Sequence, residues 1–205
     1  MIPEQLAMLQ KMHGIFQVHE GLNDLEAFTR LIEWVAVQTS VQIGVTTEWM
    51  KESTHKELHK EFRPEILRDV IHDWFGELYH RLIGTPWSAL DIVKTIADGD
   101  ARVDWDPSVP SPPKAICFPH CGTGFDIIAT FKTAGNSAIY YGLELDTLKY
   151  RVTLVNMALY GIPAHILCAD YTVIDPFMGS DNWRFSNIWE PLPVEEFKLR
   201  PHVVI

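Results

Sequence analysis

The stretch that decides the fold is Phe118-Pro119-His120-Cys121-Gly122-Thr123-Gly124. It follows a short apolar run at residues 115–118 and precedes a helical pattern, so the sequence predicts a strand, a glycine turn and a helix. A glycine turn at this position lets backbone N–H groups approach the polar end of a ligand. The turn has one Gly-x-Gly and no third glycine, so the dinucleotide-binding fingerprint is incomplete. A purely structural turn is the alternative interpretation.

The residues after this turn alternate between strand and helix patterns. Strands are predicted over residues 138–145, 164–169 and 184–189, with a last one at 202–205, and a helix over residues 148–159. Strand and helix in turn indicate an α/β fold with a mostly parallel sheet.

The first 83 residues have a helical pattern instead. One capping box, Asn23 with Glu26, marks a helix start, and Pro64 suits the first turn of a later helix. Another helix is expected around residues 46–62. Two apolar stripes at helical spacing indicate packed helices: Leu25, Phe28, Leu31, Ile32 and Val35, and then Leu67, Val70, Ile71, Trp74, Leu78 and Leu82.

A connector rich in proline and turn residues, 84–113, separates the two patterns. The predicted organisation is therefore a helical region at residues 1–83, the connector at 84–113 and an α/β core at 114–205.

Acidic side chains stand at the ends of the next two predicted strands. Glu144 lies about 20 residues after the glycines, where a carboxylate can accept hydrogen bonds from ribose hydroxyls. Asp170 and Tyr171 end the following strand and suit an adenine amino group and its ring face. Together with the glycine turn, these strand ends predict a nucleoside-binding crevice. The alternative is that Glu144 and Asp170 are helix N-caps.

Residues 69–171 resemble the N6-adenine DNA methyltransferases of type I restriction-modification systems, the modification subunits. Five segments carry the resemblance, and they match the family's helix before the cofactor domain, its Thr-Pro element, its Cys-Gly-Ser/Thr-Gly turn, its Gly-x-Glu strand and its Asn-x-x-x-x-Gly-Ile helix end. In that order they are Asp73 to Tyr79, Gly84-Thr85-Pro86, Pro119 to Gly124, Tyr141 to Leu145, and Asn156 to Ile162.

This resemblance implies a Rossmann-like methyltransferase core, an incomplete sheet and S-adenosylmethionine (SAM) as the cofactor. The residues that it implies for cofactor binding are Thr85, Pro86, Pro119, Cys121, Gly122, Gly124, Glu144, Leu145, Asp170 and Tyr171. No metal is expected. His55 and His59 have the i, i+4 spacing of a two-histidine face, but no third ligand is evident.

The family's catalytic tetrad, Asn/Asp-Pro-Pro-Tyr/Phe, corresponds to the segment Ser186 to Pro193, which departs from it. Either Asn187 stands for the tetrad's amide, or Glu190 and Pro191 stand for its first two positions. Neither register supplies both prolines and the aromatic ring, which hold and activate the weakly nucleophilic adenine amine. Phe118 also replaces the Asp that opens the family's glycine turn. These departures indicate a degenerate catalytic motif.

Two hypotheses follow for function. The first is a SAM-dependent adenine-N6 DNA methyltransferase in which Glu190, Pro191 or Asn187 serves the target amine. The second is a degenerate methyltransferase-fold binding or scaffold subunit in a restriction-modification or anti-restriction setting. Methylation of a protein or small molecule would use the same crevice, and nucleotide-dependent redox chemistry is a more distant alternative.

The net charge and the length of the chain indicate what a partner would have to supply. The 17 basic and 27 acidic residues leave a net charge of −10, the wrong sign for a protein that grips DNA alone. The chain ends at Ile205, soon after Pro191, so the core is expected to be cut short and target recognition to come from a partner subunit in a homo- or hetero-oligomer. No apolar run approaches the roughly 18 residues of a membrane helix, so a cytoplasmic protein with no membrane association is expected.

Overall fold

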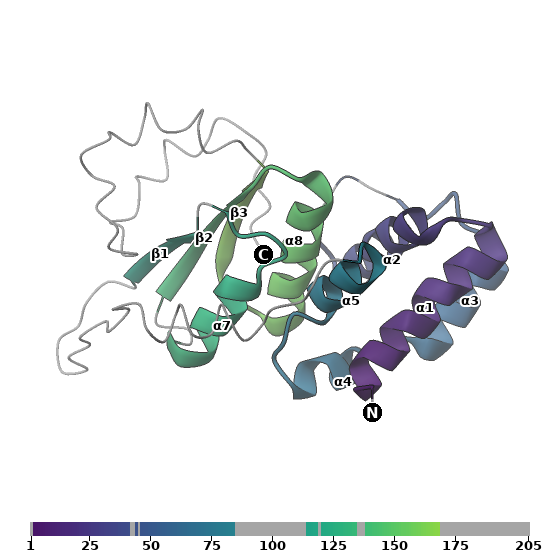
Figure 1. The fold of residues 1–205 in the computed structure, drawn as a ribbon, viewed down its shortest axis with the longest axis horizontal. Helices are drawn as coiled ribbons and strands as arrows, with labels where there is room; N and C mark the ends of the chain where they lie inside the picture. The colour runs from purple at the N-terminus through teal and green to yellow at the C-terminus, as the bar shows by residue number, and fades with distance from the viewer. Residues whose placement is uncertain are drawn as a thin grey trace.

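The computed structural model describes residues 2–41, 44, 46–84, 114–118, 120–134 and 138–168. These residues form a helical region followed by an α/β core (Figure 1). Most of the predicted connector, and the predicted strands at 184–189 and 202–205, lie outside them. None of the helices within these ranges combines the length and the apolarity that crossing a membrane requires.

The helical region contains α1 (Glu4–Glu20), α2 (Asp24–Gln38), α3 (Glu52–Glu61), α4 (Pro64–Asp69) and α5 (Trp74–Leu82). The predicted capping box starts α2, because Asn23 Oδ1 accepts from the Glu26 N–H (3.0 Å) and Glu26 Oε2 accepts from the Asn23 N–H (3.1 Å). Pro64 opens α4, as expected for a residue with no N–H to satisfy.

Both predicted apolar stripes differ from the expectation. The stripe from Leu67 to Leu82 belongs to two helices rather than one, because Asp73 adopts a non-helical conformation and its side chain caps α5. Val70, in the break, is 49% exposed. Leu25 is equally exposed, so it lies off the buried face of α2.

The helix expected around residues 46–62 starts only at Glu52. Residues 47–50 form a turn before it, in which the Trp49 indole N–H donates to the Thr46 carbonyl (2.8 Å).

The core contains three parallel strands, β1 (Lys114–Phe118), β2 (Ala138–Glu144) and β3 (Ala164–Cys168), in the spatial order β1-β2-β3. The helices α7 (Phe125–Ala134) and α8 (Thr147–Tyr160) connect them. These elements confirm the strands predicted at 115–118, 138–145 and 164–169 and the helix at 148–159, each to within one residue at either end. Three parallel strands in sequential order form one half of a doubly wound, Rossmann-like sheet.

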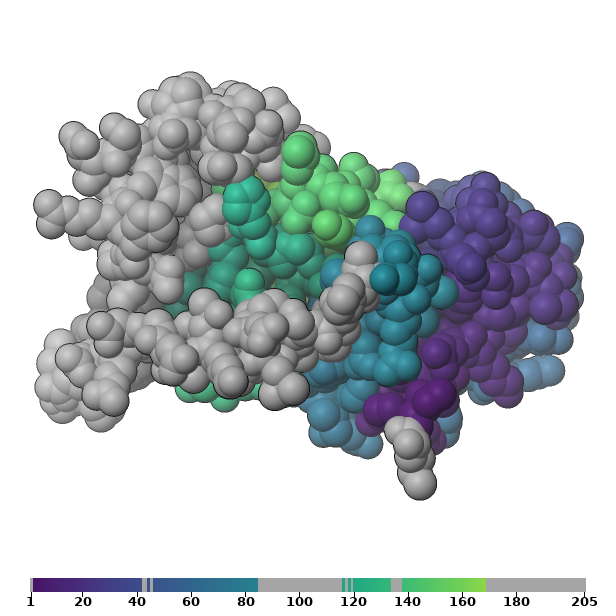
Figure 2. Space-filling view, in the orientation of Figure 1, coloured from purple at the N-terminus to yellow at the C-terminus, as the bar shows by residue number. Residues whose placement is uncertain are grey.

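Helix α8 joins the two parts of the protein. It packs against β2 and β3 on one side and against α2, α4 and α5 on the other, and in Figure 1 it lies between the sheet and the helical region. The side chain of Glu33 on α2, 5% exposed, accepts from Arg151 on α8 (2.8 Å) and from Arg30 (2.7 Å). The helical region, purple to blue in Figure 2, therefore directly abuts the teal and green core.

Candidate cofactor site

The glycine turn lies at the carboxyl end of β1 and is bound to the neighbouring strand. The Cys121 N–H donates to the Leu143 carbonyl of β2 (2.9 Å), and the Gly124 N–H closes the turn on the Cys121 carbonyl (2.8 Å). The φ angles of Gly122 (+55°) and Gly124 (+91°) are in the left-handed region, where other residues are strained. A Cβ at Gly124 would also lie 3.1 Å from side-chain atoms of α8.

The turn leaves backbone donors open. Within the described residues, neither the Gly122 N–H nor the Thr123 N–H has an acceptor. Successive N–H groups of a turn that leads into a helix N-terminus form a concavity that binds anions, and the turn leads directly into α7. This arrangement suits a carboxylate or a phosphate.

Glu144 ends β2 directly beside this turn, because Cys121 is hydrogen-bonded to Leu143, the residue before it. One carboxylate oxygen, Oε1, accepts from the Asp146 N–H (2.8 Å). The other has no partner among the described residues. The side chain is partly exposed, so it can accept hydrogen bonds from a ligand in front of the sheet edge.

The N-cap of α8 is Asp146 rather than Glu144. Asp146 Oδ1 accepts from the N–H groups of Leu148 (2.8 Å) and Lys149 (3.0 Å). The alternative interpretation of Glu144 as a helix cap is therefore wrong, and Glu144 keeps an oxygen for another role.

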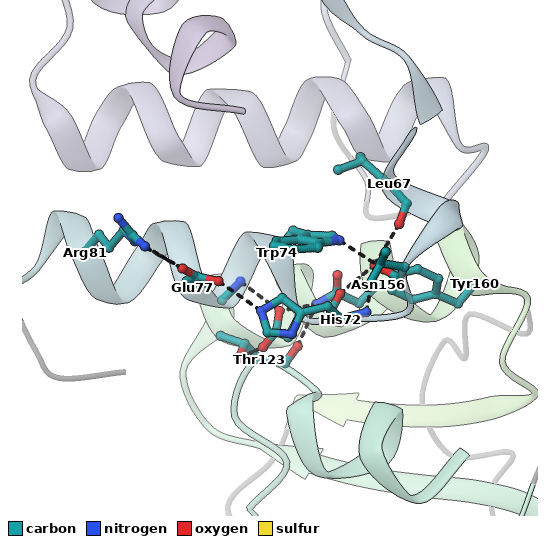
Figure 3. Close-up of polar contacts among 11 residues, drawn as sticks. Leu67, His72, Trp74, Glu77, Arg81, Thr123, Asn156 and Tyr160 are labelled. Atoms are coloured by element: carbon teal, nitrogen blue, oxygen red, sulfur yellow. Dashed lines mark hydrogen bonds and ion pairs between the residues drawn. The ribbon is translucent and has the colours of Figure 1, made fainter. Parts of the chain in front are cut away.

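A buried polar cluster joins the turn to α5 and α8. The Asp73 carboxylate accepts from the Thr123 hydroxyl, from the Gly76 N–H (2.7 Å) and from Asn156 Nδ2 (2.7 Å). Asn156 Nδ2 also donates to the Thr123 carbonyl (2.9 Å). Figure 3 shows these contacts between α5, the turn and α8. Burial raises the pKa of the Asp73 carboxyl to about 6, although the hydrogen bonds from Thr123, Gly76 and Asn156 each lower it.

A second set of bonds around the cluster holds the segment before α5. The Tyr160 hydroxyl donates to the His72 carbonyl (2.5 Å), and the His72 ring contacts Glu77 (Nε2 to Oε2, 2.9 Å). Glu77 in turn accepts from Arg81 (2.7 Å). The position of Asp73 is thus set by both α5 and α8.

The structure brings together five of the residues predicted to bind the cofactor: Cys121, Gly122, Gly124, Glu144 and Leu145. The backbone of Cys121 fastens the turn to β2. Its side chain is 3% exposed and packs over Gly142, where a Cβ would lie 2.9 Å from the sulfur. Leu145 is 66% exposed at the strand end. The other predicted site residues lie outside the described residues: Thr85, Pro86, Pro119, Asp170, Tyr171, Asn187, Glu190 and Pro191.

Three residues of this site were not among the predicted ligands: Asp73, Thr123 and Asn156. Each lies inside a segment that carries the family resemblance. Their place in these segments is the one feature of the sequence that points to them, because nothing in the local pattern around each residue indicates that the three side chains meet.

Comparison with known proteins bears on the fold. No protein-family model matches the sequence, and no curated protein matches it either. Among solved structures, the chain is similar to a Listeria monocytogenes protein provisionally assigned as a class I SAM-dependent methyltransferase, with a TM-score of 0.53 and 14% sequence identity. The two proteins share a Rossmann-like fold.

The structural likeness extends over most of this chain and about half of the other. It covers 82% of this chain and 52% of the other, so the chain spans about half the length of the protein that it matches. The residues after Gly84 make up less than two thirds of the chain. A likeness over 82% therefore includes part of the helical region as well as the α/β core.

Proposed function

We propose that this chain binds SAM at the carboxyl ends of β1 to β3, and that it acts as a methyltransferase-like subunit related to the adenine-N6 DNA methyltransferases. The observation that carries the proposal is the hydrogen bond between Cys121 and Leu143. It holds the glycine turn beside Glu144. Among the described residues, two N–H groups of the turn and one Glu144 carboxylate oxygen have no partner.

The glycine turn and Glu144 match two polar parts of the cofactor. The Gly122 and Thr123 N–H groups suit the carboxylate of its methionine part, because successive backbone donors at a helix start bind anions. Glu144 suits its ribose hydroxyls, which donate to carboxylates. Asp170 and Tyr171 would complete the site at the adenine end. Bound SAM supplies an electrophilic methyl group, and the chain's part is to hold the cofactor and present an acceptor.

The substrate class proposed is adenine in DNA, reached through a partner subunit. This follows from the resemblance of residues 69–171 to modification subunits and from the net charge of −10, which opposes unaided binding to a phosphate backbone. A basic partner that reads the target sequence would supply the positive charge for binding to DNA.

A second candidate is a binding or scaffold subunit that keeps the cofactor crevice without methyl transfer. The sequence at Ser186 to Pro193 favours it, because neither register around Asn187 or Glu190 provides the Pro-Pro-aromatic turn. Phe118 in place of an acidic residue points the same way.

Calorimetry tests cofactor binding. We expect the full chain to bind SAM or S-adenosylhomocysteine, and Glu144→Ala to abolish binding. Glu65→Ala is the matched control, because Glu65 is an exposed carboxylate on α4 with no partner among the described residues. No heat from the intact protein at millimolar cofactor would refute the proposal.

Methyl transfer separates the two candidates. The protein is incubated with tritiated SAM and unmethylated genomic DNA, with and without candidate partner proteins. Label in adenine supports the enzyme. If the protein binds the cofactor and no label appears in adenine in any of these incubations, the result supports the binding subunit.

A further inference from the structure

We propose that Asp73, a residue of the helical region, is a positioning residue for the glycine turn: its carboxylate holds Thr123 so that the Gly122 and Thr123 N–H groups stay open to the cofactor. This inference rests on the proposed function. It adds that cofactor affinity depends on a contact made from outside the α/β core.

Asp73 and Asn156 grip Thr123 from two sides. The Thr123 hydroxyl donates to Asp73 Oδ2, and the Thr123 carbonyl accepts from Asn156 Nδ2 (2.9 Å). Asn156 Nδ2 also donates to Asp73 Oδ1 (2.7 Å), which closes the cluster. Asp73 and Asn156 are fully buried and Thr123 is 5% exposed, so water does not compete for these bonds.

The middle of the turn depends on these contacts. Backbone hydrogen bonds fix Cys121 and Gly124 at its two ends. Between them, the Gly122 carbonyl accepts from the Thr153 hydroxyl (2.7 Å), and Thr123 is held by Asp73 and Asn156. None of these bonds uses the N–H of Gly122 or of Thr123, so both groups stay available to a ligand.

Capping of α5 does not explain the whole contact. The cap uses Asp73 Oδ1, which accepts from the Gly76 N–H, whereas Oδ2 is committed to Thr123. Placing a carboxylate here carries a desolvation cost that an apolar contact of the same size would avoid. The second oxygen therefore has a separate role, across 50 residues of sequence.

Gly76 makes the close approach feasible. A Cβ at this position would overlap both the Asp73 carboxylate and the Thr123 hydroxyl. The first turn of α5 thus lies directly against the glycine turn, and the residue type at position 76 is set by the Asp73–Thr123 pair.

The test measures S-adenosylhomocysteine affinity of the full chain by calorimetry. We expect Thr123→Val, which removes the hydroxyl at nearly constant shape, to raise Kd about tenfold. Thr123→Ser keeps the hydroxyl and should stay within about twofold of the unchanged protein. Asp73→Ser keeps one side-chain oxygen for the cap and leaves none for Thr123, so it should resemble Thr123→Val. Because both changes remove one contact, the double variant should be little weaker than either single one.

The control for general destabilisation is Asn23→Ala. Asn23 caps α2 as Asp73 caps α5, but it is exposed and contacts Glu26 rather than the turn. It should lower stability without changing the cofactor Kd. Values for Thr123→Val and Asp73→Ser within about twofold of the unchanged protein would overturn the proposed role.

Amide hydrogen exchange of the cofactor-free protein provides the second measurement. The Cys121 and Gly124 N–H groups, which are hydrogen-bonded, should exchange faster in Thr123→Val than in Thr123→Ser. Equal exchange in the two variants would overturn the positioning role whether or not cofactor binds. If the unchanged protein binds no cofactor, the proposed function fails, and the exchange result still decides the role of Asp73.

Discussion

Two buried carboxylates connect the helical region to the core, and they do so in different ways. Glu33 lies between two guanidinium groups, Arg30 on its own helix and Arg151 on α8. Asp73 has three neutral donors and, among the described residues, no cation. We infer that the Glu33 ion pairs stabilise the contact between the helical region and the core. Asp73 has no such ion pair, and its hydrogen bonds hold one specific turn.

The largest expected effect comes from adding a methyl group beside the contact between Asp73 and Thr123. Gly76→Ala should destabilise the protein by about 3 kcal/mol, because its methyl group would overlap the Asp73–Thr123 pair. Gly14→Ala is the matched control, since a Cβ there meets nothing within 4 Å and alanine favours a helix over glycine by up to about 1 kcal/mol. Urea unfolding measures both. A stabilising Gly76→Ala would mean that the close contact does not exist.

Removing the charge of the other carboxylate should have the next largest effect. Glu33→Gln should lower the free energy of unfolding by about 2 kcal/mol, a figure below the usual range for buried pairs because Arg30 and Arg151 are partly exposed. Glu52→Gln, in the exposed pair with Lys56, should change it by less than about 0.5 kcal/mol. Similar losses from the two variants would contradict the stabilising role of Glu33.

The pH dependence of stability distinguishes the two carboxylates further. The pKa of Asp73 is raised from 3.8 to about 6 in the folded protein, so the folded state holds this proton more tightly than the unfolded state. The stability it contributes is complete below about pH 4 and is lost as the pH rises through about 6. The stability of the unchanged protein relative to Asp73→Asn should therefore fall by roughly 1 kcal/mol between pH 5 and 7.5. Parallel curves of stability against pH for the two proteins would show that the pKa of Asp73 is not raised.

Local patterns explain which parts were predictable from sequence. The strands are short apolar runs bounded by proline, glycine and polar residues, so both their positions and the turn at Gly122 and Gly124 could be read directly. The break before α5 was missed because Val70 and Ile71 continue the apolar spacing across it. The cap of α8 was assigned to Glu144 as an alternative because two carboxylates, Glu144 and Asp146, precede that helix and either could accept from its first N–H groups.

The buried cluster could not be predicted for a different reason. Asp73 and Thr123 are 50 residues apart, and Asp73 and Asn156 are 83 residues apart. Their meeting depends on how α5 packs against α8, which no periodicity specifies. Sequence alone thus locates the turn that we propose to face the cofactor, and misses the residues that support it.

The most direct test of the central claim is a titration of the isotope-labelled full chain with S-adenosylhomocysteine, followed by two-dimensional amide NMR. The account predicts that the largest shifts are at the amide groups of Gly122 and Thr123, with smaller ones at Glu144 and Leu145. Saturating shifts confined to other parts of the chain, or no shifts at millimolar ligand, would contradict it.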